Sequence, residues 1–169
     1  MAGGNGMNID RRSFNKLILG GIALWCVMRG KRVMADETIE KISKPDAEWK
    51  KELTPAQYDV LRQEGTDPPF SGPLNDEKHT GTFVCAGCAL PLFPSKFKFD
   101  SGTGWPSFYD VIPGHVEKKI DHKIIVARTE YHCARCGGHQ GHVFPDGPAP
   151  TGLRYCNNGS ALKFIPEKT

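Results

Sequence analysis

The sequence predicts a mainly β domain of the β-rich α+β class, with short helices at its N-terminal end. Two observations support this prediction. The chain is rich in turn formers, with 19 glycines and 13 prolines among 169 residues. Its second half consists of short apolar or alternating runs separated by turn residues, which is typical of antiparallel strands. A chain of this length buries one sizeable core and is expected to form one domain.

Two helices are predicted ahead of the strands, at residues 47–53 and 54–65. Thr54 is a suitable N-cap, Pro55 suits the first helical position and Gly65 is a suitable stop. The sequence "NNG" at 157–159 predicts a turn between the last two strands. The predicted strands are 82–88, 94–99, 122–133, 141–144, 153–156 and 161–165.

Charge separates the first 35 residues from the rest. They hold six basic residues and one acidic residue, which leaves 16 Lys and Arg against 18 Asp and Glu in the remaining body. The body is therefore mildly acidic, with a net charge of −2. A broad phosphate-binding surface is not implied, and we expect no nucleic-acid partner.

The N-terminal segment has the composition of an export signal. Adjacent arginines, Arg11 and Arg12, precede the twelve-residue apolar run "LILGGIALWCVM", which is too short to span a bilayer but fits a signal-peptide core. Small residues predict cleavage after Ala35. The stretch "DRRSFNK" resembles a twin-arginine signal, except that Asn15 replaces the usual apolar residue.

These features predict three segments and a location. Residues 1–35 are the export signal, 36–47 a polar linker, and 48–169 the folded domain. We expect the mature protein in a bacterial periplasm, or anchored to the membrane if the leader is not cleaved.

Two Cys-x-x-Cys pairs form a metal-binding signature. Cys85 and Cys88 are separated by 44 residues from Cys133 and Cys136. Two such knuckles supply four thiolates for one structural zinc ion. A glycine in each knuckle, Gly87 and Gly137, suits a tight turn. Two disulfides or a redox-active pair are the alternatives, and an oxidising compartment favours disulfides.

Cys156 is the remaining cysteine of the body, since Cys26 lies in the leader. A lone cysteine is commonly a small buried apolar residue. However, residues two apart share a strand face, so Arg154 and Asn158 are expected beside it. A neighbouring cation favours the reactive thiolate.

Other candidates for the site are two histidines and a tryptophan. His139 and His142 lie in the glycine-rich stretch "GGHQGHVF", a composition less typical of a core, although each is also compatible with a structural role. Trp105 stands between Gly104 and Pro106 on a loop. It fits either a core position or the wall of a small apolar pocket.

Four motifs together resemble the methionine sulfoxide reductases of the B type, which are specific for the R epimer. They are "CAGC", "SGTGWPSF", "RTEYHCARCGGHQGHVFPDGP" and "GLRYCNNGSALKFIP", and the resemblance runs from about residue 49 to residue 166. It implies two small antiparallel sheets, one zinc per chain, a Cys156 nucleophile and a role in repairing proteins after oxidative stress. The implied site also includes Trp105, His139, His142, Arg154 and Asn158, with Asp146 as a residue that orients others.

The implied reaction suits the residue types. A thiolate at Cys156 attacks the electrophilic sulfur of the sulfoxide, a histidine protonates the leaving oxygen, and Cys156 becomes a sulfenic acid. Many members carry a cysteine where Thr103 stands. Without it, we expect an external reductant, either a small thiol or a thioredoxin-like protein. Asn157 replaces a usually apolar residue, but alternation points it away from the site.

Two other functions remain compatible with the residues. A zinc-ribbon binding module would use the knuckles alone, and a thiol peroxidase would use a single reactive cysteine. The acidic body disfavours the first for nucleic acid. We expect a monomer whose substrate is oxidised methionine, in proteins or as the free amino acid.

Overall fold

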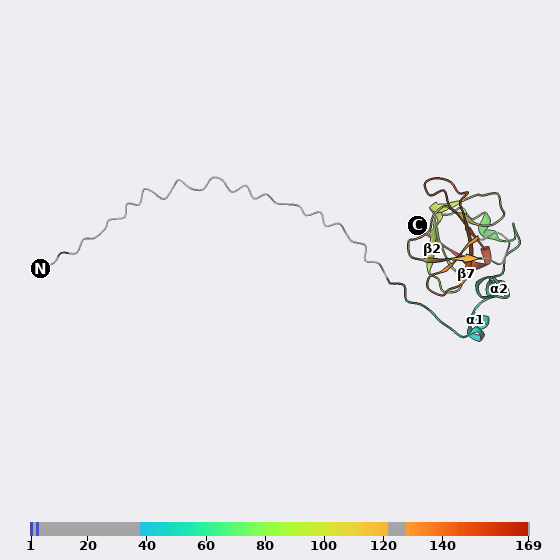
Figure 1. The fold of residues 1–169 in the computed structure, drawn as a ribbon, viewed down its shortest axis with the longest axis horizontal. Coiled ribbons are helices and arrows are strands. Elements are labelled where there is room, and N and C mark those ends of the chain that lie inside the picture. The colour runs from blue at the N-terminus through green and yellow to red at the C-terminus, as the bar shows by residue number, and fades with distance from the viewer. Residues whose placement is uncertain (2, 4–37, 122–127, 169) are drawn as a thin grey trace. The chain divides into compact units, whose positions relative to one another are not determined.

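In the computed structural model, the described residues are 1, 3, 38–121 and 128–168. The chain divides into two units, Met1–Asp36 and Glu37–Thr169, and every helix and strand described below belongs to the second (Figure 1). The predicted signal at 1–35 lies almost entirely outside the described residues. Within the described part, no helix is long and apolar enough to cross a membrane.

The two predicted helices are present. Helix α1, Asp46–Glu52, buries Trp49, whose ring is covered by the cations of Lys44 and Arg62, each 5.0 Å from its centroid. Helix α2, Pro55–Gln63, begins with a capping box in which Thr54 and Gln57 exchange hydrogen bonds. This box satisfies N–H groups that a helix leaves unpaired at its start.

The end of α2 differs from the prediction. Glu64 itself takes the left-handed conformation, with φ 57°, and Gly65 follows it. The Gly65 N–H donates to the Asp59 carbonyl at 3.0 Å. A hydrogen bond of this kind closes the last turn, so the helix ends at Gln63, two residues before the predicted glycine.

All sheet pairings are antiparallel. A three-stranded sheet has the order β2-β1-β9, formed by Pro91–Pro94, Gly81–Cys85 and Leu162–Pro166. A six-stranded sheet has the order β3-β4-β8-β7-β6-β5. Its strands are Lys98–Phe99, Ser107–Phe108, Arg154–Asn157, His139–Phe144, Arg128–Cys133 and Val116–Asp121. The predicted class, mainly β with two antiparallel sheets and N-terminal helices, is confirmed.

Aromatic side chains fill the core. Phe93 stacks on Phe108 with ring centroids 4.1 Å apart, and Phe83 meets Phe108 edge-on at 5.0 Å. Tyr131 and Tyr155 extend the cluster along the six-stranded sheet. Because Phe83 and Phe93 come from one sheet and Phe108 from the other, this cluster holds the sheets together. Truncating one such ring to alanine typically costs about 3–5 kcal/mol.

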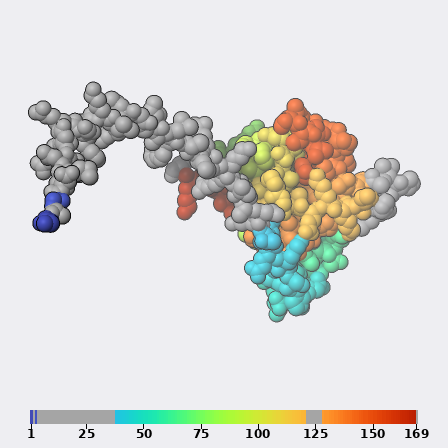
Figure 2. Space-filling view, turned by 60° about the vertical axis from the view of Figure 1, so that its left-hand side comes forward, coloured from blue at the N-terminus to red at the C-terminus, as the bar shows by residue number. Residues whose placement is uncertain are grey.

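The described residues include three short 3-10 helices: η1 Pro73–Asn75 between α2 and β1, η2 Ser95–Phe97 between β2 and β3, and η3 Gly159–Ala161 between β8 and β9. The last one forms the turn predicted at 157–159. In contrast, the strand predicted at 94–99 is interrupted by η2, so that only β3 remains of it. In the space-filling view, the cyan segment that includes α1 gathers at one end of the domain and an orange-red segment from the C-terminal part of the chain at the other (Figure 2).

Candidate active site

A row of partnered residues crosses five neighbouring strands and contains Cys156. The row is Lys119, Glu130, His142, Cys156 and Ser107, on β5, β6, β7, β8 and β4 respectively. Residues directly opposite each other on antiparallel strands project from the same face. The sheet register therefore places the thiol of Cys156 between His142 and Ser107.

Arg154 lies two residues before Cys156 on the same strand, and Asp146 holds it in position. The Arg154 Nε and Nη2 groups donate to the two Asp146 carboxylate oxygens, both at 2.9 Å. The guanidinium also stacks over the Phe144 ring at 4.5 Å. A bidentate pair fixes the plane of the guanidinium. Asp146 thus has the geometry of an orienting residue, although its catalytic contribution stays a prediction.

Two opposing effects act on the Cys156 thiol. Burial raises its pKa, whereas the positive charge of Arg154 and hydrogen bonds from Arg154 and Thr103 lower it. The net direction is upward from the ordinary cysteine value. Since only the thiolate is a strong nucleophile, Arg154 and Thr103 are the groups that favour the reactive form of this half-buried sulfur.

The loop that carries Trp105 is tied to the strand of the nucleophile. The indole Nε1 donates to the Asp67 carbonyl at 2.9 Å, and the Asn157 N–H donates to the Pro106 carbonyl at 2.9 Å. The Asp67 N–H donates to the Asn158 side-chain oxygen at 3.0 Å, and the Asp67 carboxylate accepts from the Ser160 N–H at 2.7 Å. The partly buried indole is therefore held in a fixed orientation close to β8.

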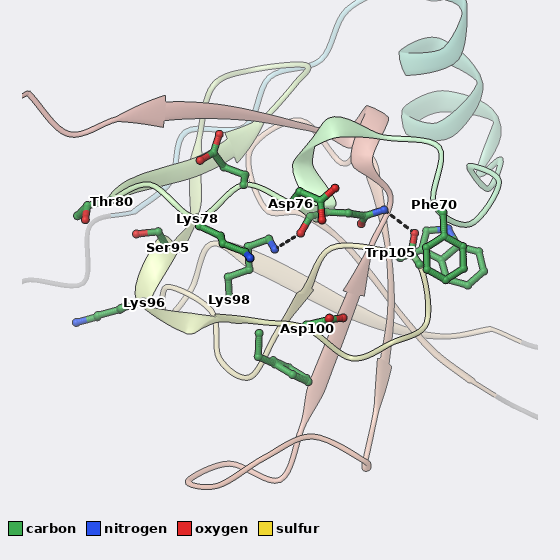
Figure 3. A pocket seen from close by; sticks show the side chains of 13 residues that line it. Phe70, Asp76, Lys78, Thr80, Ser95, Lys96, Lys98, Asp100 and Trp105 are labelled. Carbon is green, nitrogen blue, oxygen red and sulfur yellow. Dashed lines mark hydrogen bonds between the residues drawn. The ribbon is translucent and has the colours of Figure 1, made fainter.

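A groove of about 590 Å³ begins at Trp105. Phe70, with 73% of its surface exposed, lines the same end of it (Figure 3). Gly104 makes this packing possible, because a Cβ there would lie 2.8 Å from the Phe70 ring. Farther along, Lys98 donates to the Asn75 carbonyl, and Asn75 donates to the Gly104 carbonyl (Figure 3). The groove thus joins an aromatic end to a charged one.

The two histidines differ in environment. His139 is buried, with 2% of its surface exposed, and its Nδ1 lies 2.5 Å from Glu130 Oε1. Burial lowers the pKa of His139 to about 4, although Glu130 opposes this shift. His139 is therefore neutral at pH 7. The expectation that a glycine-rich stretch keeps it outside the core is wrong, because β7 runs through the middle of the six-stranded sheet.

His142 is half-buried and directly opposite Cys156. Its ring centroid lies 5.5 Å from that of His139. Of the two imidazoles, His142 is the one that the sheet register places beside the thiol. The structure therefore favours His142 as a proton donor to a substrate near Cys156 and places His139 behind it.

Asn158 lies just beyond β8 and differs from the simple alternation. Its side-chain oxygen accepts from the Asp67 N–H at 3.0 Å, and its amide nitrogen donates to the Gln140 carbonyl at 3.2 Å. The strand ends at Asn157, so Asn158 no longer follows the period of Arg154 and Cys156. These hydrogen bonds connect the end of β8 at Asn158 to the loop of Asp67 and to β7 at Gln140.

The two cysteine pairs form turns of the same geometry. Cys85 ends β1 and Cys133 ends β6, and each carbonyl accepts from the N–H four residues later, Ala89 or Gly137, at 2.9 Å. Both of these residues have positive φ, 57° and 67°. Glycine at 137 suits this backbone. In the first knuckle, the left-handed residue is Ala89 and not Gly87.

The four sulfurs converge as zinc requires. Cys85 and Cys136 are 3.6 Å apart and Cys88 and Cys133 3.4 Å, and all four lie within 4.8 Å of one another. Two ligands of a tetrahedral zinc with Zn–S bonds of ~2.3 Å lie about 3.8 Å apart. A disulfide bond is about 2.05 Å long, and all four cysteines are free thiols here. The cluster therefore fits zinc better than two disulfides.

Gln140 connects the metal site to the candidate active site. This fully buried side chain donates to Cys85 Sγ at 3.4 Å and accepts from the Asn157 amide at 3.5 Å. Asn157 is also fully buried, on the face of β8 away from Cys156, as alternation predicts. Hydrogen bonds to a metal-bound sulfur orient the ligand and favour its anionic form.

Comparison with known proteins reveals the family. The model of the SelR domain matches residues 53–166, which include both sheets, the four paired cysteines and Cys156. The chain belongs to the SelR domain family. It is 52% identical over 134 residues to the "Peptide methionine sulfoxide reductase MsrB" of Agrobacterium fabrum, a match that covers 79% of this chain and 99% of the relative.

Other SelR relatives are similarly close. A protein of the same name from Methanosarcina barkeri is 54% identical over 136 residues, covering 80% of this chain and 94% of its own. One from Leptospira interrogans is 53% identical over 128 residues, covering 75% and 98%. The chain therefore spans nearly the full length of these relatives.

Sequence reasoning missed three residues that shape this SelR site: Asp67, Glu130 and Gln140. Each acts through a cross-strand or loop contact that chain spacing does not reveal. Glu130 gave the clearest available signal, since an acidic residue in an otherwise strand-like run is expected to have a partner when buried. Its partner depends on the register of β6 and β7, which local pattern does not fix.

Proposed function

We propose that the chain is a peptide-methionine (R)-S-oxide reductase, in which the thiolate of Cys156 reduces the sulfoxide to methionine. The observation that carries the proposal is a half-buried thiol between Arg154 and His142, in a SelR domain whose relatives are named peptide methionine sulfoxide reductases. These relatives do not favour a zinc-ribbon binding module or a thiol peroxidase.

In the proposed reaction, Cys156 attacks the sulfoxide sulfur and forms an S–S bond. The sulfoxide oxygen receives a proton from His142, and the oxygen is then transferred to Cys156 with release of methionine. The products are methionine and a Cys156 sulfenic acid, so the sulfoxide gains two electrons and the cysteine loses two. Arg154 supports the thiolate at the start of this sequence.

Other residues position the substrate. The indole of Trp105 provides an apolar surface for the ε-methyl group of the sulfoxide. His139, which is neutral and buried, and Asn158, which ties the loops, keep the walls of the site in place. Fixed dipoles around the sulfoxide oxygen stabilise charge as it builds. These roles follow from the resemblance together with the placement of the side chains.

The sulfenic acid must be reduced by a thiol from outside the domain. Thr103 contacts the Cys156 sulfur, and a hydroxyl at this position cannot form a disulfide. Two equivalents of an external thiol restore Cys156 and release water and a disulfide. The candidates are a small thiol or a thioredoxin-like protein.

The four-cysteine site has a structural role in this proposal. When bound, zinc ties the knuckle after β1 to the knuckle after β6 and so links the two sheets. The sulfurs that hold it are Cys85, Cys88, Cys133 and Cys136.

We further propose that the domain acts as a monomer outside the cytosol. The support for the location is the paired arginines and short apolar run of residues 1–35, which resemble a twin-arginine signal except at Asn15. Replacing Arg11 and Arg12 by lysine is expected to trap the precursor in the cytosol. Cell fractionation tests this, and an unchanged distribution would count against the proposed export route.

The activity is tested with each sulfoxide epimer, as the free amino acid and within a peptide, using the zinc-loaded full chain and dithiothreitol. We expect turnover of the R epimer alone. Cys156→Ser should abolish turnover and retain zinc, because the sulfur lies outside the metal cluster. Appreciable turnover by this variant would show that Cys156 is not the nucleophile.

A further inference from the structure

A second group of metal-ligand side chains lies between β6 and β7. Glu130, His132 and His139 each direct one ligand atom to a common point, with all three atoms within 4.8 Å of one another. Glu130 Oε1 lies 2.5 Å from His139 Nδ1 and 3.3 Å from His132 Nε2. Glu130 and His139 are both 98% buried.

The orientation of His132 matches that of a metal ligand. Its Nδ1 lies 3.2 Å from the Gly137 carbonyl oxygen, which only accepts hydrogen bonds, so Nδ1 carries the proton. In the neutral ring, Nε2 therefore presents a lone pair toward the Glu130 carboxylate. Metal-ligating histidines commonly donate their other N–H to a backbone carbonyl in this way.

The hydrogen bonds of the structure leave the buried nitrogens of this group incompletely satisfied. His132 Nε2 and His139 Nδ1 are buried without a well-aligned hydrogen-bond partner, although each faces the Glu130 oxygen. The second carboxylate oxygen, Oε2, lies 3.8 Å from Lys119 Nζ. Two imidazole nitrogens and one anionic oxygen thus surround a position that suits a cation.

We propose that Glu130, His132 and His139 bind a divalent transition-metal ion at a site separate from the four-cysteine cluster. Two histidines and one carboxylate are a donor set for Zn²⁺, Co²⁺ and Ni²⁺ that leaves coordination positions open. Ligands at ~2.1 Å in a tetrahedral site lie about 3.4 Å apart, so His139 must move away from Glu130 by several tenths of an ångström.

Such an ion also bears on the proposed reductase activity. The His139 ring is 5.5 Å from the His142 ring, centroid to centroid, and His142 faces Cys156. Moving His139 onto a metal therefore alters the packing behind His142. We expect bound metal to slow reduction of the sulfoxide, a consequence that rests on the proposed function, whereas binding itself does not.

The site is tested by equilibrium dialysis of Co²⁺ against the zinc-loaded full chain without an affinity tag. We expect one bound cobalt per chain while one zinc is retained. Glu130→Gln and His132→Gln should each weaken cobalt binding by at least about tenfold, since even the partners of metal ligands contribute this much. His79→Gln is the matched control, because the side chain of His79 is 85% exposed, and should bind cobalt normally.

Visible absorption identifies the ligands. Cobalt bound to imidazole and carboxylate gives weak bands, whereas cobalt that displaces zinc from thiolates gives intense sulfur-to-metal charge transfer. Failure of the wild-type protein to bind cobalt, release of zinc, or undiminished binding by His132→Gln would overturn the proposal. If Glu130→Gln does not fold, His132→Gln decides alone.

A single turnover without thiol reductant measures the effect on activity, because dithiothreitol itself chelates metals. Saturating Co²⁺ should slow methionine release by the zinc-loaded wild-type protein and by His79→Gln, each compared with its own rate without cobalt. His132→Gln should be insensitive. If no sulfoxide is reduced under any condition, the proposed function fails while the dialysis result still decides the metal site.

Discussion

Replacing Arg154 by methionine tests how the candidate nucleophile is kept reactive. The change retains a long apolar side chain over Phe144 but removes the cation beside Cys156. Because Arg154 is only 8% exposed, its charge is weakly screened at the thiol. An opposite charge in contact with a titratable group shifts its pKa by roughly one unit or more. The pKa of Cys156, already raised by burial, should therefore rise further.

The consequence is a slower reaction of the thiol. Below the pKa, a rise of about one unit reduces the thiolate fraction by about tenfold. Alkylation of Cys156 by iodoacetamide at pH 7 should slow by about this factor, and the two rates should converge at high pH. Asp146 loses its partner, but its side chain is 58% exposed, so the folding cost should be at most about 1 kcal/mol.

The assay follows Cys156 alkylation by mass spectrometry in the zinc-loaded protein at several pH values. Lys163→Met is the matched control, since it removes an exposed cation from β9 in the other sheet and should leave the alkylation rate unchanged. An equal or faster rate in Arg154→Met would show that the guanidinium does not stabilise the thiolate.

Three further predictions concern the metal, the missing resolving thiol and the buried imidazole. Cys88→Ser should lose zinc and lower the melting temperature sharply, because a structural zinc contributes folding energy directly; metal analysis and calorimetry check this, and retained zinc contradicts it. Thr103→Cys should form a disulfide with Cys156 after one turnover without reductant, which mass spectrometry detects. The wild-type protein should instead give a dimedone adduct at Cys156. A disulfide between Cys156 and one of the four paired cysteines, with release of zinc, would refute both expectations. Burial lowers the pKa of His139 to about 4, so as the pH falls below about 6.5 a proton binds to this imidazole in the unfolded chain but not in the folded one. The contribution of His139 to the free energy of unfolding is therefore complete above pH 6.5 and declines by up to about 3 kcal/mol toward pH 4. His139→Gln should lose less stability between pH 7 and pH 5 than the wild type in urea titrations, and equal losses would exclude His139 as the titrating group.

Features set by local chemistry were predictable from the sequence. The capping box at Thr54 and the paired knuckles depend on residues within a few positions of each other. The strand Val116–Asp121 was missed because its charged residues do not alternate with apolar ones. The burial of His139 was missed for a different reason, since it depends on which strands flank β7.

In the candidate site, too, some positions follow from local sequence and others depend on how the strands pair. Cys156 and Arg154 share a strand, and their proximity follows from the two-residue period. The placement of His142 opposite Cys156, and of Glu130 opposite His142, depends on the register of three strands. A shift of one residue would direct these side chains to the other face, and no pattern within a single strand determines that register.

Gln140 connects the four-cysteine cluster by hydrogen bonds to the strand that carries Cys156, so a change at the cluster affects the surroundings of this thiol. The side-chain Nε2 of Gln140 donates to the Cys85 sulfur and its Oε1 accepts from Asn157, while the backbone carbonyl accepts from Asn158. Gln140 therefore contacts the four-cysteine cluster and both residues that follow Cys156. Oxidation that strips the zinc deprives this buried amide of an anionic acceptor, at a cost of about 1–3 kcal/mol. Loss of zinc would thereby loosen the strand that carries Cys156, so the oxidants that create the proposed substrate would also weaken the enzyme proposed to reduce it.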